Sequence, residues 1–169
     1  MRLIMGIDPG SRVTGWGIIQ TCGNENKFVD CGTISLNEKS LSLRLLTLYN
    51  SLLRVIDKYK PQDVVVEKIF LGKNADSAFK LGHARGVCIM SAASKQIDVY
   101  EYAARKVKQS LTGSGAATKE QVQLLAMSHL KIKQKIALDA SDALSLALCH
   151  AVEQKVLAKI LIAEKGVFL

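Results

Sequence analysis

The stretch GIDPGSRVTGWGII, residues 6–19, decides how the chain begins to fold. Its apolar halves flank the turn signal DPGS, which predicts the end of one strand and the start of an antiparallel neighbour. Asp8 stands at the end of the first strand, directly after apolar residues. An ionised carboxylate in such surroundings is unfavourable unless a cation or hydrogen bonds compensate it. Aspartate before Pro-Gly is also ordinary turn chemistry, so Asp8 alone leaves both interpretations open.

The composition is that of a packed globular protein rather than a disordered one. Of the 169 residues, 49% are hydrophobic and 22% are charged, with only two prolines, which predicts one domain with a sizeable core. No apolar run reaches the length of a membrane span, and no signal-peptide layout opens the chain. We therefore expect a cytoplasmic protein with no membrane partner. The four cysteines form no CxxC pair, which favours reduced, buried thiols over a zinc site or disulfides.

Apolar residues recur with the period of strands and then of helices along the chain. They predict strands over residues 2–8, 13–22, 27–35, 62–68 and 97–102, and helices over residues 41–60, 75–94, 103–111, 118–130 and 140–155. Three antiparallel strands followed by two strands reached through helical crossovers predict an α/β fold, a mixed five-stranded sheet with helices on both faces. The first strand then lies centrally, beside the fourth. Thr118 and Gln121 have the spacing of a capping box.

Glu67 ends the fourth predicted strand, directly after three valines, as Asp8 ends the first. Both carboxylates should therefore leave the same edge of the sheet side by side, where open α/β sheets place their ligands. Asp139 and Asp142, in LDASDALSLALCHA, are three residues apart and project from nearly the same face of a helix. The competing interpretation makes Asp139 an N-cap and Asp142 an acid favoured by the helix dipole.

Four carboxylates that converge on one edge repel each other and need divalent cations to balance their charge. The apolar helix that follows Asp142 must pack on the sheet, which brings its start near the strand ends. All-oxygen ligands favour magnesium or manganese over zinc. Two such ions about 4 Å apart form the arrangement that activates a water and stabilises the leaving oxygen in phosphodiester cleavage.

The net charge of +8 is concentrated in one segment of the chain. Between residues 102 and 136, seven basic residues stand against the single acid Glu120, an excess of six positive charges. Such an excess fits a solvated face as well as a functional surface. The functional interpretation is a surface that binds phosphates.

Four segments together resemble the RuvC family of bacterial Holliday-junction resolvases, in the RNase H-like nuclease superfamily. They are GIDPGSRVTGWGII, VVVEKIFLGKNADSAFKLGHARG, YEYAARKVKQSLTGSGAATKEQV and LDASDALSLALCHA. The resemblance runs from about Leu3 to Ala151, with the motifs in the family's order and spacing. It implies an RNase H-like nuclease domain over residues 1–155 and leaves residues 156–169 as a C-terminal tail with no assigned role.

The resemblance implies an enzyme of DNA recombination and repair. Members of the family are homodimeric, magnesium-dependent crossover junction endodeoxyribonucleases that nick two strands of like polarity across a four-way junction and leave 5′-phosphate ends. Asp8, Glu67, Asp139 and Asp142 match the family's four metal-binding, catalytic carboxylates. Two Mg²⁺ ions per site are implied, with Mn²⁺ able to substitute. The RuvA-RuvB branch-migration complex is the implied partner besides junction DNA.

Three further residues match DNA-binding positions of the family. Lys108 and Lys119 correspond to basic residues near the cleaved strand, and both lie in the basic segment. Phe70 corresponds to an aromatic residue at the junction centre, although Ile69 and Leu71 beside it fit a core phenylalanine equally well. The helix over residues 75–94, rich in small side chains, resembles the family's dimer contact. The three histidines have no spacing that indicates catalysis or metal ligation, and we expect structural or surface roles for them.

Two other functions were weighed against a junction nuclease. The stretch at residues 6–19 also resembles the first phosphate loop of actin-like ATPases and sugar kinases, which need two such domains to enclose a nucleotide. This chain has room for one and lacks a second glycine-rich phosphate loop. A non-catalytic junction-binding module would need only the basic segment. The four acids argue against such a module, because carboxylates near DNA weaken binding unless they hold metal.

Overall fold

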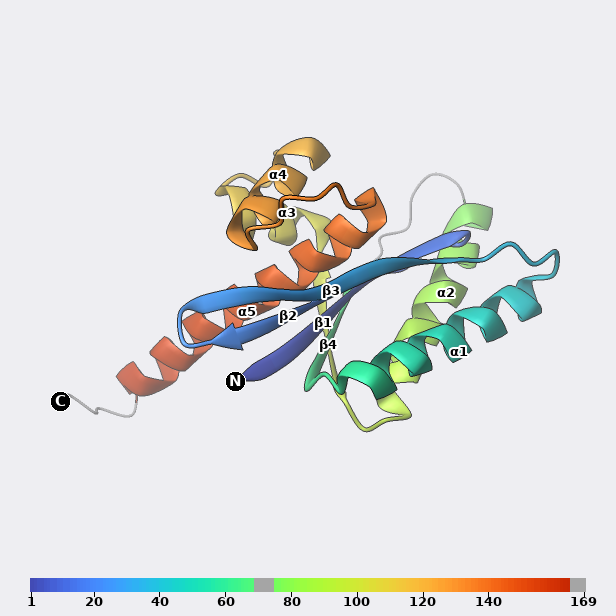
Figure 1. Ribbon diagram of the computed structural model, residues 1–169, viewed down its shortest axis with the longest axis horizontal. Helices are drawn as coiled ribbons and strands as arrows, with labels where there is room; N and C mark the ends of the chain where they lie inside the picture. Colours follow the sequence, from blue (N-terminus) through green and yellow to red (C-terminus); the bar gives the residue numbers. More distant parts are fainter. Residues whose placement is uncertain (69–74, 165–169) are drawn as a thin grey trace.

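The fold is built on one five-stranded sheet whose central strand is β1 (Figure 1). The computed structural model describes residues 1–68 and 75–164. The strands are β1 (Arg2–Asp8), β2 (Val13–Cys22), β3 (Glu25–Ser35), β4 (Asp63–Lys68) and β5 (Asp98–Ala103), in the spatial order β3-β2-β1-β4-β5. β1, β2 and β3 pair antiparallel, whereas β4 and β5 pair parallel to β1 and to each other. The predicted mixed sheet, with β1 beside β4, is confirmed.

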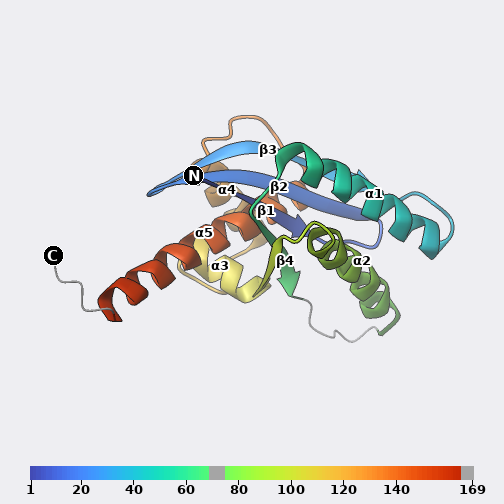
Figure 2. The ribbon, with the colours of Figure 1, turned by 90° about the horizontal axis from the view of Figure 1, so that it is seen from below.

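Helices cover both faces of the sheet, as predicted (Figures 1 and 2). One face is covered by α1 (Leu41–Tyr59) and α2 (Ala75–Ala93), which pack beside each other. The other face carries the long α5 (Leu138–Glu164), with α3 (Ala104–Thr112) and α4 (Lys119–His129) packed against it. The predicted capping box is present at the start of α4, where the Thr118 hydroxyl accepts from the Gln121 N–H at 3.3 Å.

The alternation of strand side chains divides the core into two parts. Met5 and Ile7 of β1 pack towards α1 and α2. Ile4 packs towards α5, together with Ile19 of β2 and Val65 of β4. Asp8 follows the same alternation and therefore points to the α5 side of the sheet. Its carboxylate thus shares a face with the helix that carries the other two acids.

Glycines in β1 and β2 let α5 lie directly on the sheet. A Cβ atom at Gly6 would collide with the carbonyl oxygen of Ala143, and one at Gly15 would collide with the carbonyl group of Asp139. At Gly17 it would lie 2.6 Å from Leu144 Cγ. Gly6 pairs with Gly17 across the two strands, and Asp8 pairs with Gly15. These missing side chains form the groove that seats the first turns of α5 beside Asp8.

The end of α5 differs from the prediction. The helix was expected over residues 140–155, but it runs from Leu138 to Glu164 and projects beyond the sheet (Figure 1). Its last turns carry exposed apolar side chains, including Leu157 and Leu161. No glycine or proline interrupts this part of the chain before Gly166, so the helix continues after its buried stripe has ended.

The cysteines are less buried than expected. All four cysteines are free, but only Cys88 and Cys149 are buried, and Cys22 is exposed. The expectation of four buried thiols was therefore wrong for the two cysteines of strands β2 and β3.

Within residues 1–68 and 75–164, no helix combines the length and the apolar character needed to cross a membrane.

Candidate active site

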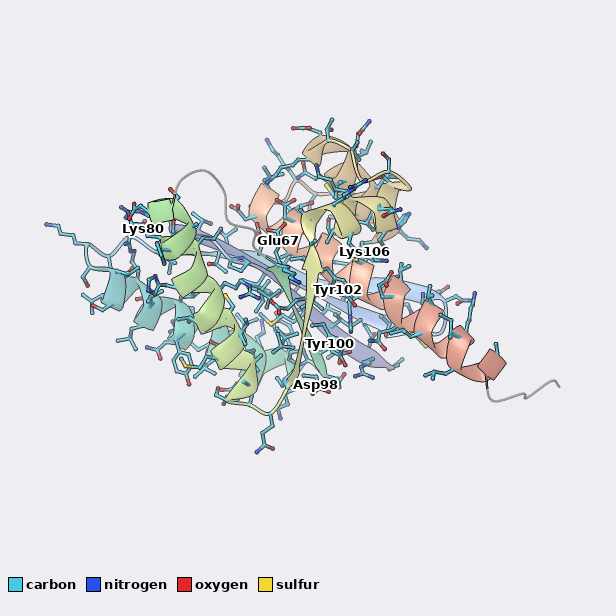
Figure 3. The ribbon with its side chains drawn as sticks, turned by 180° about the vertical axis from the view of Figure 1, so that it is seen from behind. Glu67, Lys80, Asp98, Tyr100, Tyr102 and Lys106 are labelled. Carbon is cyan, nitrogen blue, oxygen red and sulfur yellow. The ribbon has the colours of Figure 1, made fainter. Side chains whose placement is uncertain are left out.

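Asp8 and Glu67 lie side by side at the carboxyl edge of the sheet. The last residue pair between the parallel strands β1 and β4 is Ile7 with Val66, so the next residue of each strand is one of the two acids. Both carboxylates are half-buried. Figure 3 shows Glu67 where β4 ends, between α2 and the helices of the opposite face. The predicted juxtaposition of these two acids is therefore present.

Asp142 joins this pair from the second turn of α5. The groove formed by the strand glycines brings the start of the helix against β1 and β2, and Asp142 then lines the same cleft as Asp8 and Glu67. Asp139 lies in the first turn of α5, inside the helix rather than before it, so the alternative N-cap position does not hold. Asp139 does not line the cleft, although its charge raises the pKa of both Asp8 and Asp142.

The cleft has a volume of about 80 Å³ and combines acids with bases. Two lysines, Lys108 of α3 and Lys119 at the start of α4, face the three carboxylates across it. The remainder of the wall is largely apolar and comes from α3, α4 and α5: Ala104, Val107, Val122, Ser145 and Leu146. The two lysines that the resemblance pointed to are thus beside the acids.

Burial and mutual repulsion make the ionised acids unfavourable. Desolvation, followed by the charges of Glu67, Asp142 and Asp139, raises the pKa of Asp8 to about 7. Desolvation and then the charge of Asp142 raise the pKa of Glu67. The pKa of Asp142 is also raised by desolvation, and Lys119 partly opposes this rise. The site therefore holds more negative charge than its own lysines balance.

The donor set fits a hard divalent cation, but the side chains are not yet arranged around one. Carboxylate oxygens are the ligands that Mg²⁺ and Mn²⁺ prefer. In the described ranges 1–68 and 75–164, no group of three or more His, Cys, Asp or Glu side chains is placed so that it could hold a metal ion. Lys119 Nζ lies 3.2 Å from Asp142 Oδ2 and occupies part of the space around that carboxylate. A metal ion at Asp142 would therefore share this carboxylate with Lys119 or displace it.

The sequence analysis also singled out Phe70 and the histidines. Phe70 lies outside the described residues. His150 is fully buried, and its Nδ1 lies 2.9 Å from Tyr102 Oη, which agrees with the expected structural role. The sequence interpretation missed the buried partner of His150, Asp63, which also pairs with Arg2. The sequence signal that could have revealed Asp63 is its place as an acid at the start of an otherwise apolar strand.

The sheet order and the helices on both faces place the chain in the RNase H-like fold class. A family model described as crossover junction endodeoxyribonuclease RuvC matches residues 4–150. The chain therefore belongs to the RuvC family.

Relatives in this family match over most of their length. The crossover junction endodeoxyribonuclease RuvC of Marinobacter nauticus is 46% identical over 151 residues, which cover 89% of this chain and 86% of the relative. That of Aliivibrio fischeri MJ11 is 46% identical over 157 residues, covering 93% and 91%. The structure of Thermus thermophilus RuvC superposes with a TM-score of 0.83 at 28% identity, covering 91% of this chain and 96% of the other. The same protein in complex with a Holliday junction substrate gives 0.82 at 26% identity, with the same coverage.

Proposed function

We propose that this protein is a structure-selective endonuclease that resolves four-way DNA junctions by paired symmetric nicks in recombination and repair. The observation that carries the proposal is the cleft at the carboxyl edge of the sheet, in a chain of the RuvC family. Asp8, Glu67 and Asp142 line that cleft opposite two lysines. The carboxylates of the cleft and a DNA phosphate are all negatively charged. They can lie together only when a cation neutralises them, which supports metal-assisted hydrolysis over simple DNA binding.

The proposed ligands of the metal are Asp8, Glu67, Asp139 and Asp142. The raised pKa of Asp8, about 7, comes mainly from desolvation and then from the charges of the neighbouring acids. It supports this assignment, because a bound cation compensates both effects. Bound Mg²⁺, in two ions per site, supplies activation of the attacking water and charge stabilisation of the leaving oxygen, and Mn²⁺ replaces it. The chain itself positions the carboxylates, since β1, β4 and α5 fix their backbones.

Lys108 and Lys119 are the proposed contacts to the phosphates of the cleaved strand. Both stand at the mouth of the acidic cleft, and the side chain of Lys119 is 63% exposed. When metal holds Asp142, the Lys119 ammonium is released and free to bind a DNA phosphate. Exposed lysines at residues 131, 133 and 135 follow α4, and they extend the same positive surface towards the DNA arms.

Phe70 is the proposed wedge at the junction centre. The proposal rests on sequence, because Phe70 stands three residues after Glu67. If Glu67 holds metal at the scissile phosphate, Phe70 must lie near the DNA. A large apolar side chain inserted between bases opens a branch point at a reduced unstacking penalty, because stacking is already weakened there.

A homodimer through α2 would supply the two active sites that paired nicks require. The outer face of α2 leaves Phe79 69% exposed and Met90 52% exposed. These side chains border an open groove of about 440 Å³ between α1 and α2, floored in part by Gly82 and Gly86. Apolar surface beside small residues supports a helix-to-helix contact with a second copy. The RuvA-RuvB complex in the bacterial cytoplasm is the proposed source of junctions.

Cleavage of matched substrates tests the proposed function. The protein is incubated with a four-way junction and with a linear duplex of the same sequence, with and without Mg²⁺, while ATP consumption is followed in parallel. We expect paired nicks at symmetric positions of the junction, only with Mg²⁺ and without ATP turnover. Equal cutting of the duplex, binding without cleavage, or ATP hydrolysis would each contradict the proposal.

A further inference from the structure

Arg85 connects the helix α2 to the strand that carries Glu67. Its Nε donates to the backbone carbonyl oxygen of Glu67 at 3.3 Å. Its Nη2 forms an ion pair with Oε1 of Glu101 on β5. Glu101 pairs with Val66 across the parallel strands, so the guanidinium bridges β4 and β5 at their carboxyl ends. It does so from the α2 side of the sheet, whereas the acidic cleft lies on the α5 side.

In the described part of the chain, the backbone of Glu67 pairs with a neighbouring strand on one side only. The pairing of β4 with the central strand ends at Val66, one residue before Glu67, and beyond it only β5 continues beside β4, with Tyr102 opposite Glu67. The side chain of Arg85 is 25% exposed, so its two bonds form in partly desolvated surroundings, where charge-assisted hydrogen bonds are strong. The planar fork of arginine reaches both acceptors at once, which a lysine ammonium does not reproduce.

We infer that Arg85 is a positioning residue that holds Glu67 in place for metal binding and ties this ligand to α2. The inference rests on the proposed function, since it takes Glu67 as a metal ligand. Partners that orient a ligand from outside the coordination sphere commonly change metal affinity or activity by about 10- to 100-fold when they are removed. Ala84 and Cys88, beside Arg85 on α2, are buried against the sheet, so the helix offers a fixed base for this restraint.

The two faces of α2 contact different parts of the proposed assembly. The outer face of α2 carries the groove lined by Phe79 and Met90, and its inner face carries Arg85. A contact that shifts α2 would therefore also shift the backbone of Glu67. Arg85 is thus one contact that links the helix of the proposed dimer surface to the strand that carries Glu67.

The test measures Mn²⁺ affinity by calorimetry in the complete protein, with junction nicking as a second readout. Arg85→Ala should weaken Mn²⁺ binding by about 10-fold, the lower end of such effects, with unchanged junction affinity in EDTA. Arg85→Lys should fall between Arg85→Ala and the wild type. Glu101→Gln removes the charge of the ion pair but keeps an acceptor for the guanidinium, so it should weaken Mn²⁺ binding less than Arg85→Ala does. The matched control is Lys80→Ala, on the same helix, which forms an ion pair with the exposed Asp76.

The outcomes separate this inference from the proposed function. If the wild type binds Mn²⁺ at a site lost in Asp142→Asn, yet nicks no junction, the proposed function fails while the positioning role is still measured by the Mn²⁺ affinities. If Arg85→Ala melts at a lower temperature but binds Mn²⁺ as tightly as Lys80→Ala does, its role is structural only and the inference is overturned. A wild type that binds no Mn²⁺ in this cleft overturns both.

Discussion

Lys119 Nζ and Asp142 Oδ2 lie 3.2 Å apart, so a lysine from the start of α4 partly neutralises an acid from α5. The Asp142 charge is the main cause that raises the pKa of Lys119. The pair places a positive charge beside the acids of the cleft. On the proposed assignment of Asp142 as a ligand, a metal ion would compete with Lys119 for this carboxylate.

Asp142→Asn should separate cleavage from binding. The substitution keeps the shape of the side chain but removes a ligand charge, so metal occupancy falls while the basic surface is unchanged. We expect nicking to fall by more than about 100-fold, the upper end of what the loss of an outer partner does, at unchanged junction affinity in a gel-shift assay. Asp76→Asn, at an exposed position of α2, is the control. Wild-type nicking by Asp142→Asn in limiting Mg²⁺ would reject the ligand assignment.

Charge reversal of Lys108 should give the opposite pattern. Lys108→Glu removes a phosphate contact beside the cleft and adds repulsion, so DNA binding itself weakens. The slope of log affinity against log salt should flatten by about one unit. Lys159→Glu, exposed on the projecting part of α5, makes the same charge change away from the cleft and should leave the slope less affected. Equal slopes for Lys108→Glu and the wild type would mean that Lys108 belongs to a solvated face and makes no phosphate contact.

The sequence predicted the sheet because its signals were local. The turn signals DPGS and GNEN, the three valines before Glu67 and the Pro61 that follows α1 each mark an element end within a few residues. The neighbouring positions of Asp8 and Glu67 were predictable for a similar reason, since parallel neighbours must end at one edge, whereas the metal-binding role of the four acids remains a prediction. Sequence reasoning placed the start of this helix near the strand ends. It did not predict how closely α5 approaches the sheet, because that depends on glycines of two strands that lie opposite each other only after pairing.

Arg85 and the projecting end of α5 escaped prediction for different reasons. Arg85 acts through a backbone carbonyl 18 positions away in sequence, and no periodic pattern reports such a contact. The helix end was misplaced because the prediction followed the buried stripe, whereas helix propensity continues through Leu157 and Leu161. The prediction that Phe70 binds DNA and the prediction of a separate tail over residues 156–169 remain predictions.

The raised pKa of Asp8 makes the metal-free protein less stable at high pH. The folded state has a pKa of about 7, against an ordinary value of 3.8, so it binds more protons than the unfolded chain between these values. Stability therefore falls as the pH rises through this window and stays low above it. Asp8→Asn does not titrate, and it should raise the metal-free Tm at pH 8 by at least about 2 °C, the shift that 1 kcal/mol produces at this size.

Two controls accompany the Asp8 prediction. The gain in Tm should shrink as the pH is lowered towards 4, where the folded state binds the proton and the unfolded chain begins to bind it. Saturating Mg²⁺ should stabilise the wild type more than Asp8→Asn, because only the wild type keeps the ligand. A Tm difference that is the same at pH 4 and pH 8 would show that the ionisation of Asp8 is not its cause.

Phe70→Ala should cleave poorly without unfolding. If Phe70 is a wedge, the variant binds four-way junctions nearly as well as the wild type, and a junction with unpaired bases at its centre restores much of the activity. If Phe70 is a core residue, truncation destabilises the protein by about 3–5 kcal/mol and lowers its Tm markedly. Thermal melting and cleavage of paired and unpaired junctions distinguish the two. A cleavage defect of equal size on both substrates would rule out the wedge role of Phe70.

The central claim is that the acids at the carboxyl edge of the sheet hold the metal that cleaves DNA. Anomalous scattering from Mn²⁺ in crystals of the protein with junction DNA tests it most directly. We predict two peaks about 4 Å apart within ligand distance of Asp8, Glu67, Asp139 and Asp142, with Lys119 Nζ displaced from Asp142. The absence of any peak in this cleft, with Lys119 still paired to Asp142, would contradict the claim.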